Sequence, residues 1–199
     1  MRIVIVAHHS RSERAERLAA SMGAEIVMDE GDCGALWGHT RALRLCAPLN
    51  DRCVIMEDDA LPVPDFRAKA QAWLDDYPDS LLSFYLGTGR PPQYQPQIAH
   101  AVTYADDPDA VLCLPQLIHG VCYSIPQQYV RAVVERLPLI GAADFAIGNA
   151  WRAVSGEPVV YTIQSLVDHD DLPSVERHPD GQKRTEPRRA WRLETANGR

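Results

Sequence analysis

Hydrophobic and polar positions along the chain follow two alternating patterns. Residues 2–7 and 53–56 are mostly apolar runs without alternation, which are typical of strands buried on both faces. Between such runs, apolar residues recur at helical spacing, for example at Ala15, Leu18 and Ala19. This alternation predicts βαβ units with parallel strands and right-handed crossovers. We therefore expect an α/β fold: a single Rossmann-like domain with a mostly parallel central sheet flanked by helices.

The same patterns predict the individual elements. The expected strands cover 2–7, 24–28, 53–56, 79–86, 119–125 and 159–163, with two further short strands near 100–104 and 111–114. The expected helices are one capped by Ser12 and ending at Gly23, and others at 34–46, 64–77, 127–137 and 143–151. The stretch from 87 to 97 is expected to be irregular, and loops of that length in a compact domain are often functional.

Composition narrows the class of protein. The 199 residues suit one domain, which we place at 1–175, followed by a charged and loosely docked C-terminal tail at 176–199. A net charge of −7 argues against a protein held on nucleic acid or an anionic membrane by charge alone. No apolar run is long enough to span a bilayer. Five cysteines without a CxxC pair favour reduced thiols and a cytoplasmic location.

The end of the strand at 53–56 carries the strongest chemical signal. It runs directly into three consecutive acids, Glu57, Asp58 and Asp59. Such acids are costly at the end of a buried strand unless a cation neutralises them, and Mg²⁺ or Mn²⁺ prefers oxygen ligands. The carboxyl end of a central strand is also where open α/β sheets bind ligands. The alternative is a solvated turn whose acids cap the next helix.

Two further stretches are expected at the same edge of the sheet. The loop after the first strand begins with His8 and is a candidate nucleotide site, although ordinary polar loop residues would look the same. Gly34 and Gly38 lie at the start of the second helix, where glycine is unfavourable. They indicate a backbone close to a phosphate or sugar, or else close packing of the helix on the sheet. Arg41 beside them has the geometry to pair with a diphosphate.

The order of these stretches resembles nucleotide-sugar glycosyltransferases of the A-type fold, most closely glycosyltransferase family 25, the lipooligosaccharide galactosyltransferase-like group. The resemblance covers residues 1 to about 175. It is carried by the glycine-rich stretch 34–43, by the strand end Glu57-Asp58-Asp59-Ala60, by the segment 120–125 followed by Asp144, and by the closing element 164–169.

The resemblance implies that a sugar is transferred from a nucleoside diphosphate sugar, with UDP as the expected nucleotide, to an acceptor hydroxyl. It implies Mn²⁺ or Mg²⁺ bound by Asp59 and His169, with Asp58 and Glu57 nearby. It also implies Asp144 as the general base of an inverting reaction. The simpler interpretations are a surface histidine at 169 and a helix N-terminal acid at 144.

The remaining site residues are predicted as two groups. The donor-binding residues are expected to be His8, Ser10, Arg11, Glu30, Gly38, His39, Arg41 and Asp58, with Asp32 as an alternative to Glu30 near the base or ribose. The acceptor is expected to contact Arg90 and Tyr94 in the irregular stretch.

Four functions stay open at this point. The first is a metal-dependent glycosyltransferase acting on a saccharide or a lipid-linked acceptor such as lipooligosaccharide. The second is a phage-type DNA glycosyltransferase that modifies a hydroxymethylated base, using the basic residues 183–184 and 188–189 of the tail and the loop at 87–97. The third is a non-catalytic module that binds sugar nucleotides, and the fourth is a metal-dependent phosphohydrolase that uses the same acids.

Overall fold

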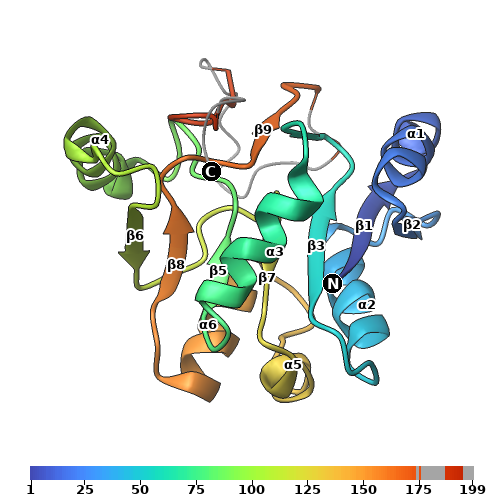
Figure 1. Ribbon diagram of the computed structural model, residues 1–199. Helices are drawn as coiled ribbons and strands as arrows, with labels where there is room; N and C mark the ends of the chain where they lie inside the picture. Colours follow the sequence, from blue (N-terminus) through green and yellow to red (C-terminus); the bar gives the residue numbers. More distant parts are fainter. Residues whose placement is uncertain (174, 176–186, 195–199) are drawn as a thin grey trace.

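The computed structural model of the protein describes residues 1–173, 175 and 187–194. Its centre is a seven-stranded sheet (Figure 1). In spatial order the strands are β2 (Glu25–Asp29), β1 (Arg2–His8), β3 (Cys53–Glu57), β7 (Cys122–Ser124), β5 (Leu81–Ser83), β8 (Val159–Thr162) and β6 (Val111–Leu114). β7 and β6 run opposite to the other strands, which all point the same way. The α/β prediction is confirmed at this level: the sheet is mixed and mostly parallel.

Helices cover both faces of the sheet. They are α1 (Ser12–Met22), α2 (Ala35–Cys46), α3 (Phe66–Asp76), α4 (Gln95–Tyr104), α5 (Gln127–Val134) and α6 (Ala143–Ser155). Side chains of α1 and α3 pack on one face, and those of α2, α4, α5 and α6 pack on the other. In Figure 1, α3 lies in front of the sheet. None of the helices in the described part of the chain has the length and apolar character that crossing a bilayer requires.

The alternation of side chains along β1 explains the two layers. Ile3 and Ile5 point to the face that α1 and α3 cover, whereas Val4 and Val6 point to the face that α2 covers. All four side chains are buried, as the unbroken apolar run predicts. β3 is buried in the same way along Cys53–Met56, so the three acids do follow a strand that lies inside the core.

Several boundaries differ from the predictions. The prediction of a strand near 100–104 is wrong. These residues belong to α4, in which Ile98 and Val102 are buried one helical turn apart. The stretch 87–97 is less irregular than expected, since it contains a 3₁₀ turn, η2 (Pro92–Tyr94), and the first turn of α4. Ser12 is the first residue of α1 and not its cap.

A small second sheet lies above the carboxyl ends of β1 and β3 (Figure 1). Its strands, β4 (Ala60–Pro62) and β9 (Val167–His169), pair antiparallel and were not predicted. β4 follows the acidic residues directly and β9 ends the closing element, so their pairing joins two distant parts of the chain. In this pairing Ala60 lies opposite His169.

The expected loosely docked tail packs against the domain wherever the structure describes it. Trp191 donates its backbone N–H to the Leu86 carbonyl at 2.9 Å, and its indole N–H to Gln95 at 2.8 Å. Glu194 forms a largely buried ion pair with Lys69, with 3.1 Å between Oε1 and Nζ. Residues 187–194 therefore contact the domain through several hydrogen bonds and an ion pair. Lys183 and Arg184 lie outside the described residues.

Candidate functional site

The predicted site residues come from three neighbouring strand ends. β1 ends at His8, β2 at Asp29 and β3 at Glu57, and the three strands are parallel. Their carboxyl ends therefore meet at one edge of the sheet, where open α/β sheets bind ligands. The loops that follow β1, β2 and β3 carry most of the expected donor and metal residues.

Asp58 and Arg11 form the centre of this edge. Asp58 Oδ2 accepts the backbone N–H of His8 at 3.0 Å, and Asp58 Oδ1 accepts from Arg11 Nη1 at 2.9 Å. The same Arg11 nitrogen donates to Asp59 Oδ2 at 2.8 Å. All three side chains are largely buried. Arg11 thus neutralises part of the acidic cluster, and it reaches Asp58 and Asp59 together.

Asp59 also has an oxygen that Arg11 does not use. Asp59 Oδ1 is buried and accepts no hydrogen bond within the described residues. It lies 3.6 Å from His169 Nε2, which the pairing of β4 with β9 brings there. Ligand atoms of Glu57, Asp59 and His169 all lie within 4.8 Å of one another. The group offers two carboxylates and one imidazole, and one of its oxygens, Asp59 Oδ1, has no hydrogen bond within the described residues. Such a group fits a divalent cation such as Mn²⁺.

The electrostatics of the three acids are uneven. Burial raises the pKa of Asp59 above its usual value, and the charge of Glu57 raises it further against His169 and Arg11. Burial also opposes the ionisation of Glu57, but the hydrogen bond from His39 leaves the pKa of Glu57 lowered overall. Arg11 and His169 therefore oppose, but do not cancel, the rise in the pKa of Asp59 that burial and Glu57 cause.

His39 is fixed between two partners inside the core. Its Nε2 lies 3.1 Å from Glu57 Oε1, and its Nδ1 lies 3.1 Å from the Tyr123 hydroxyl. An imidazole that donates to Glu57 and accepts from Tyr123 satisfies all three groups. Gly120 makes room for this pair, because a Cβ there would lie 2.8 Å from Glu57 Oε1. His39 therefore positions Glu57, and Gly120, just before β7, leaves the space for it.

Asp144 lies in the first turn of α6, near the same acids. Burial raises the pKa of Asp144 to about 6; the backbone N–H of Phe145 opposes the rise and the charge of Glu57 adds to it. Asp144 Oδ1 accepts that N–H at 2.8 Å. A carboxyl group with this pKa is ionised at neutral pH yet remains a stronger base than an ordinary aspartate.

Five predicted residues lie apart from this cluster or have another structural explanation. Gly38 packs against β1, where a Cβ would lie 2.6 Å from Val6 Cγ1, so helix packing accounts for the glycine. Arg41 is exposed and lies over the Trp37 ring at 5.2 Å. Glu30 is exposed, and its neighbour Asp32 contacts His8 instead. Tyr94 packs against the core near α4, and the Arg90 carbonyl accepts from Gln95. The functional predictions for these five residues stay untested.

Sequence reasoning missed residues that connect the site. Arg14 donates from Nε to the Asp58 carbonyl at 2.8 Å and also forms an ion pair with Asp170. Tyr123, the partner of His39, was assigned only to a strand. Arg14 lies in the first turn of α1, and Arg11 lies immediately before this helix. Two arginines three positions apart, beside the predicted nucleotide loop, are the sequence signal for this contact.

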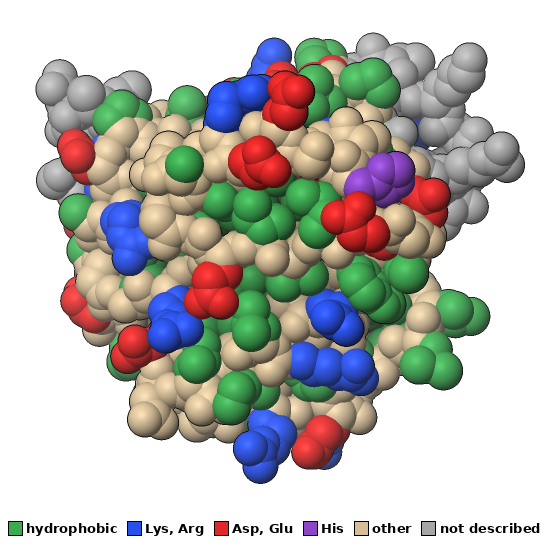
Figure 2. Space-filling view, turned by 90° about the vertical axis from the view of Figure 1, so that its right-hand side faces the viewer, with side chains coloured by type: hydrophobic (Ala, Val, Ile, Leu, Met, Phe, Trp, Pro, Cys, Tyr) green, Lys and Arg blue, Asp and Glu red, His purple; other side chains and the backbone are tan. Residues whose placement is uncertain are grey.

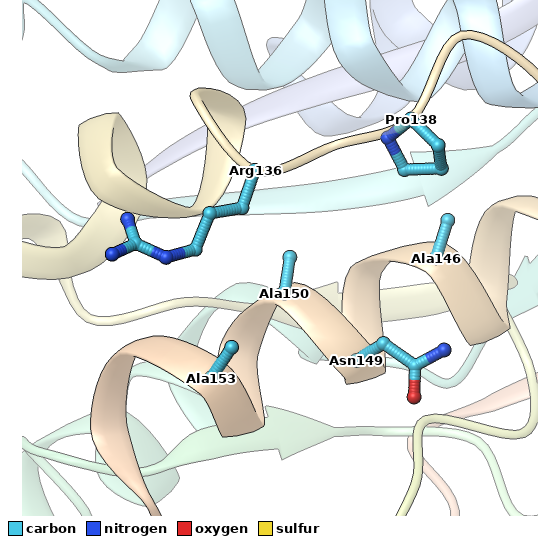
Figure 3. Close-up of a pocket in the computed structure, with 6 residues that line it drawn as sticks. All are labelled: Arg136, Pro138, Ala146, Asn149, Ala150 and Ala153. Carbon is cyan, nitrogen blue, oxygen red and sulfur yellow. The ribbon is translucent and has the colours of Figure 1, made fainter.

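Two surface grooves in the described part of the chain have different linings. One, of about 640 Å³, is lined by Ser10, Arg11, Ser12, Glu13, Arg14, Arg17, Leu172, Pro173 and Val175, and so borders the acidic cluster. The other, of about 400 Å³, separates α6 from the end of α5 and is lined mainly by small apolar residues. Figure 3 shows Ala146 and Ala150 of α6 facing the segment of Arg136 and Pro138. The first groove, with its arginines, is the better match for a phosphorylated ligand.

Comparison with known proteins establishes the fold and no family. No protein-family model and no curated protein matches this sequence. The solved structure of A197 from STIV matches with a TM-score of 0.58 and 11% identity, over 98% of this chain and 96% of that chain. A glycosyltransferase involved in the glycosylation of the major capsid of PBCV-1 matches with a TM-score of 0.34 and 12% identity, over 68% of this chain and 66% of that chain. The first likeness shows a shared fold along the whole chain, and the second is too distant to carry an argument.

Proposed function

We propose that this protein is a metal-dependent glycosyltransferase that moves a sugar from a nucleoside diphosphate sugar, with UDP as the expected nucleotide, to an acceptor hydroxyl. The observation that carries the proposal is the buried, unpartnered Asp59 Oδ1 within reach of Glu57 and His169. The resemblance of the ordered motifs to family 25 glycosyltransferases of the A-type fold supports the same function. The fold shared with A197 from STIV is compatible with it and adds nothing about chemistry.

Charge compensation is the main task of the proposed site. A divalent cation held by Glu57, Asp59 and His169 would neutralise the charge that develops on a leaving diphosphate. Arg11 holds Asp58 and Asp59 in place through its paired hydrogen bonds. His39 holds Glu57 in the same way from inside the core. The groove beside Arg11 and Arg14 offers an approach for an anionic donor.

Asp144 is the proposed general base. In an inverting transfer, the acceptor oxygen forms a bond to the anomeric carbon while the bond to the diphosphate oxygen breaks. The acceptor proton passes to Asp144. A pKa raised to about 6 suits this task, because the carboxylate is ionised at neutral pH and still takes up a proton readily. Asp144 is therefore proposed to transfer the proton and not to bind the cation.

The direct test is nucleotide release from a panel of UDP, GDP and dTDP sugars, with Mn²⁺, with Mg²⁺ and with EDTA. Transfer is expected with at least one donor, and EDTA or Asp59→Asn should abolish it. Asp65→Asn is the matched control, since Asp65 is an exposed acid whose left-handed backbone also suits asparagine. Turnover that is unchanged in EDTA and in Asp59→Asn would exclude the proposed metal role.

The competing hypothesis is a non-catalytic module that binds sugar nucleotides. One observation favours it: Arg11 already pairs with Asp58 and Asp59, so the acids have a structural cation. A module of this kind would show a ligand-induced rise in melting temperature without turnover for any donor.

The DNA-modifying alternative has less support. Arg188 forms an ion pair with Asp171, with 3.0 Å between Nε and Oδ1, and Arg189 donates to the His169 carbonyl. Arg188 and Arg189 therefore contact the domain itself, where one pairs with an acid and the other donates to a carbonyl. Hydroxymethylated duplex DNA belongs in the acceptor panel, together with saccharides and lipid-linked acceptors, and transfer to it would reverse this ranking.

A further inference from the structure

A second group of metal-ligating side chains lies at the outer end of the same sheet edge. His8 Nε2 lies 2.7 Å from Asp32 Oδ1, and His9 Nε2 lies 3.0 Å from the same oxygen. The three ligand atoms fall within 4.8 Å of one another. Figure 2 looks onto the side of α1 and β2 and shows histidine and acidic side chains next to each other at the surface. The group is accessible to ions from solution.

The backbone holds both halves of this group in place. Asp29 at the end of β2 is buried and accepts the backbone N–H groups of Gly31, Cys33 and Gly34, which fixes the loop that contains Asp32. Asp32 itself has a left-handed backbone, with φ of 52°. On the other side, the backbone N–H of His8 is bound by Asp58. These hydrogen bonds fix both loops before an ion binds, so binding requires little further ordering of the backbone.

Hydrogen bonds hold the His8 ring in place. Its Nδ1 accepts the backbone N–H of Ser10 at 3.2 Å and lies 2.8 Å from Ser10 Oγ, while its Nε2 points at Asp32. An ion on Nε2 would replace the proton that this nitrogen donates to Asp32, and the Ser10 hydroxyl would then face the proton on Nδ1. A second hydrogen-bond partner on the other ring nitrogen is the usual arrangement for metal-bound histidines.

We propose that His8, His9 and Asp32 form a second metal site, one that selects Zn²⁺ or a similar transition-metal ion. Two imidazoles and one carboxylate with open positions suit Zn²⁺, Ni²⁺ or Cu²⁺ better than Mg²⁺ or Mn²⁺. The group around Asp59 has the opposite preference because it offers two carboxylates and one imidazole. An ion at the outer site links the loop after β1 to the loop after β2 and stabilises the native chain.

Metal binding alone tests this inference, so its outcome is independent of any sugar transfer. Calorimetric titration of the apo-protein with ZnCl₂ is expected to show one tight site, and a melting-temperature rise of several degrees when Zn²⁺ far exceeds its Kd. His9→Ala and Asp32→Asn should each weaken Zn²⁺ binding about 10-fold or more. Asparagine keeps the left-handed backbone of position 32 accessible, so that variant should fold. His100→Ala, at an exposed histidine of α4, is the matched control and should bind like the unaltered chain.

Three further measurements separate this site from its rivals. Asp59→Asn should leave the Zn²⁺ titration unchanged. Cys113→Ser tests whether an exposed thiol is the ligand and should also have no effect. In a crystal soaked with Zn²⁺, the anomalous peak is expected between His8, His9 and Asp32. The inference is overturned if about 100 μM Zn²⁺ does not bind, if His9→Ala and Asp32→Asn bind it normally, or if the peak lies elsewhere.

Discussion

His169 Nε2 lies 3.6 Å from Asp59 Oδ1, across the small sheet that β4 and β9 form. The distance is too long for a hydrogen bond. It is close to the separation of about 3 Å between two neighbouring ligands that each bind a cation at about 2.1 Å. Asp59 Oδ1 is buried and accepts no hydrogen bond within the described residues. This pair is therefore the point at which metal binding is most directly testable.

Loss of either partner should remove Mn²⁺ binding. Asp59→Asn and His169→Ala are each expected to weaken Mn²⁺ at least about 10-fold, since each removes one of three protein ligands. Calorimetric titration with MnCl₂ measures this, with Asp65→Asn as the control for loss of one acid. EDTA should lower the melting temperature of the Mn²⁺-loaded chain and leave that of Asp59→Asn unchanged. Normal Mn²⁺ affinity in both variants would contradict the site.

Arg11 should contribute to stability far more than a surface arginine. Arg11→Ala leaves Asp58 and Asp59 without their shared cation, and breaking a buried pair in this way costs about 3–5 kcal/mol of unfolding free energy. Arg17→Ala is the matched control because its pair with Glu13 is exposed, and it should cost less than about 0.5 kcal/mol. Urea unfolding of both variants without metal measures the difference. A similar loss of unfolding free energy in the two variants would show that the buried pair stabilises the chain no more than the exposed pair does.

Asp144 gives the predicted pH dependence of the reaction. If it is the general base, activity should rise as the pH passes through about 6, where Asp144 ionises. Asp144→Asn should lower the rate about 10²-fold or more and remove this limb of the profile. The pH–rate profile of sugar transfer provides the measurement. A near-normal rate in Asp144→Asn would take this residue out of the mechanism.

The same pKa predicts an effect on stability with a definite sign. Asp144 has a pKa of about 6 in the native chain, above the usual aspartate value, so the native state binds more protons between pH 4 and pH 6 than the unfolded state. Stability therefore falls as the pH rises through this window. Asp144→Asn should gain up to about 3 kcal/mol relative to the unaltered chain above pH 7, and little below pH 4. Urea unfolding at several pH values separates this effect from catalysis.

Gly38 allows the packing and ligand hypotheses to be distinguished. Gly38→Ala should destabilise the chain by about 1–3 kcal/mol, because its Cβ would lie 2.6 Å from Val6 Cγ1. In a Val6→Ala background the clash is absent, and the same change should be neutral or stabilising by up to about 1 kcal/mol, since alanine favours helices. A double-mutant cycle by urea unfolding measures this coupling. Additive effects, together with weaker sugar-nucleotide binding in Gly38→Ala, would instead favour contact with the donor.

The pattern of apolar and polar residues predicted correctly those helices and strands that depend mainly on near neighbours in the sequence. The apolar runs at 2–7 and 53–56 form β1 and β3, and the residues with helical spacing from Ala15 onward lie in α1. The pattern failed at 100–104, because a short apolar run suits a strand or a buried helix equally well. Local pattern gave no sign of the hydrogen bonds to Leu86 and Ser165 that hold residues 187–194, a polar segment with little apolar surface of its own.

By itself, the sequence determined the layered α/β order and the placing of three acids at the end of a buried strand, because periodicity and strand direction follow from near neighbours. Only the tertiary structure decided that Arg11 shares Asp58 and Asp59, that β9 brings His169 to Asp59, and that Gly38 packs against Val6. Those contacts join residues far apart in the chain. Their geometry depends on how strands pair and helices pack, which no local pattern records.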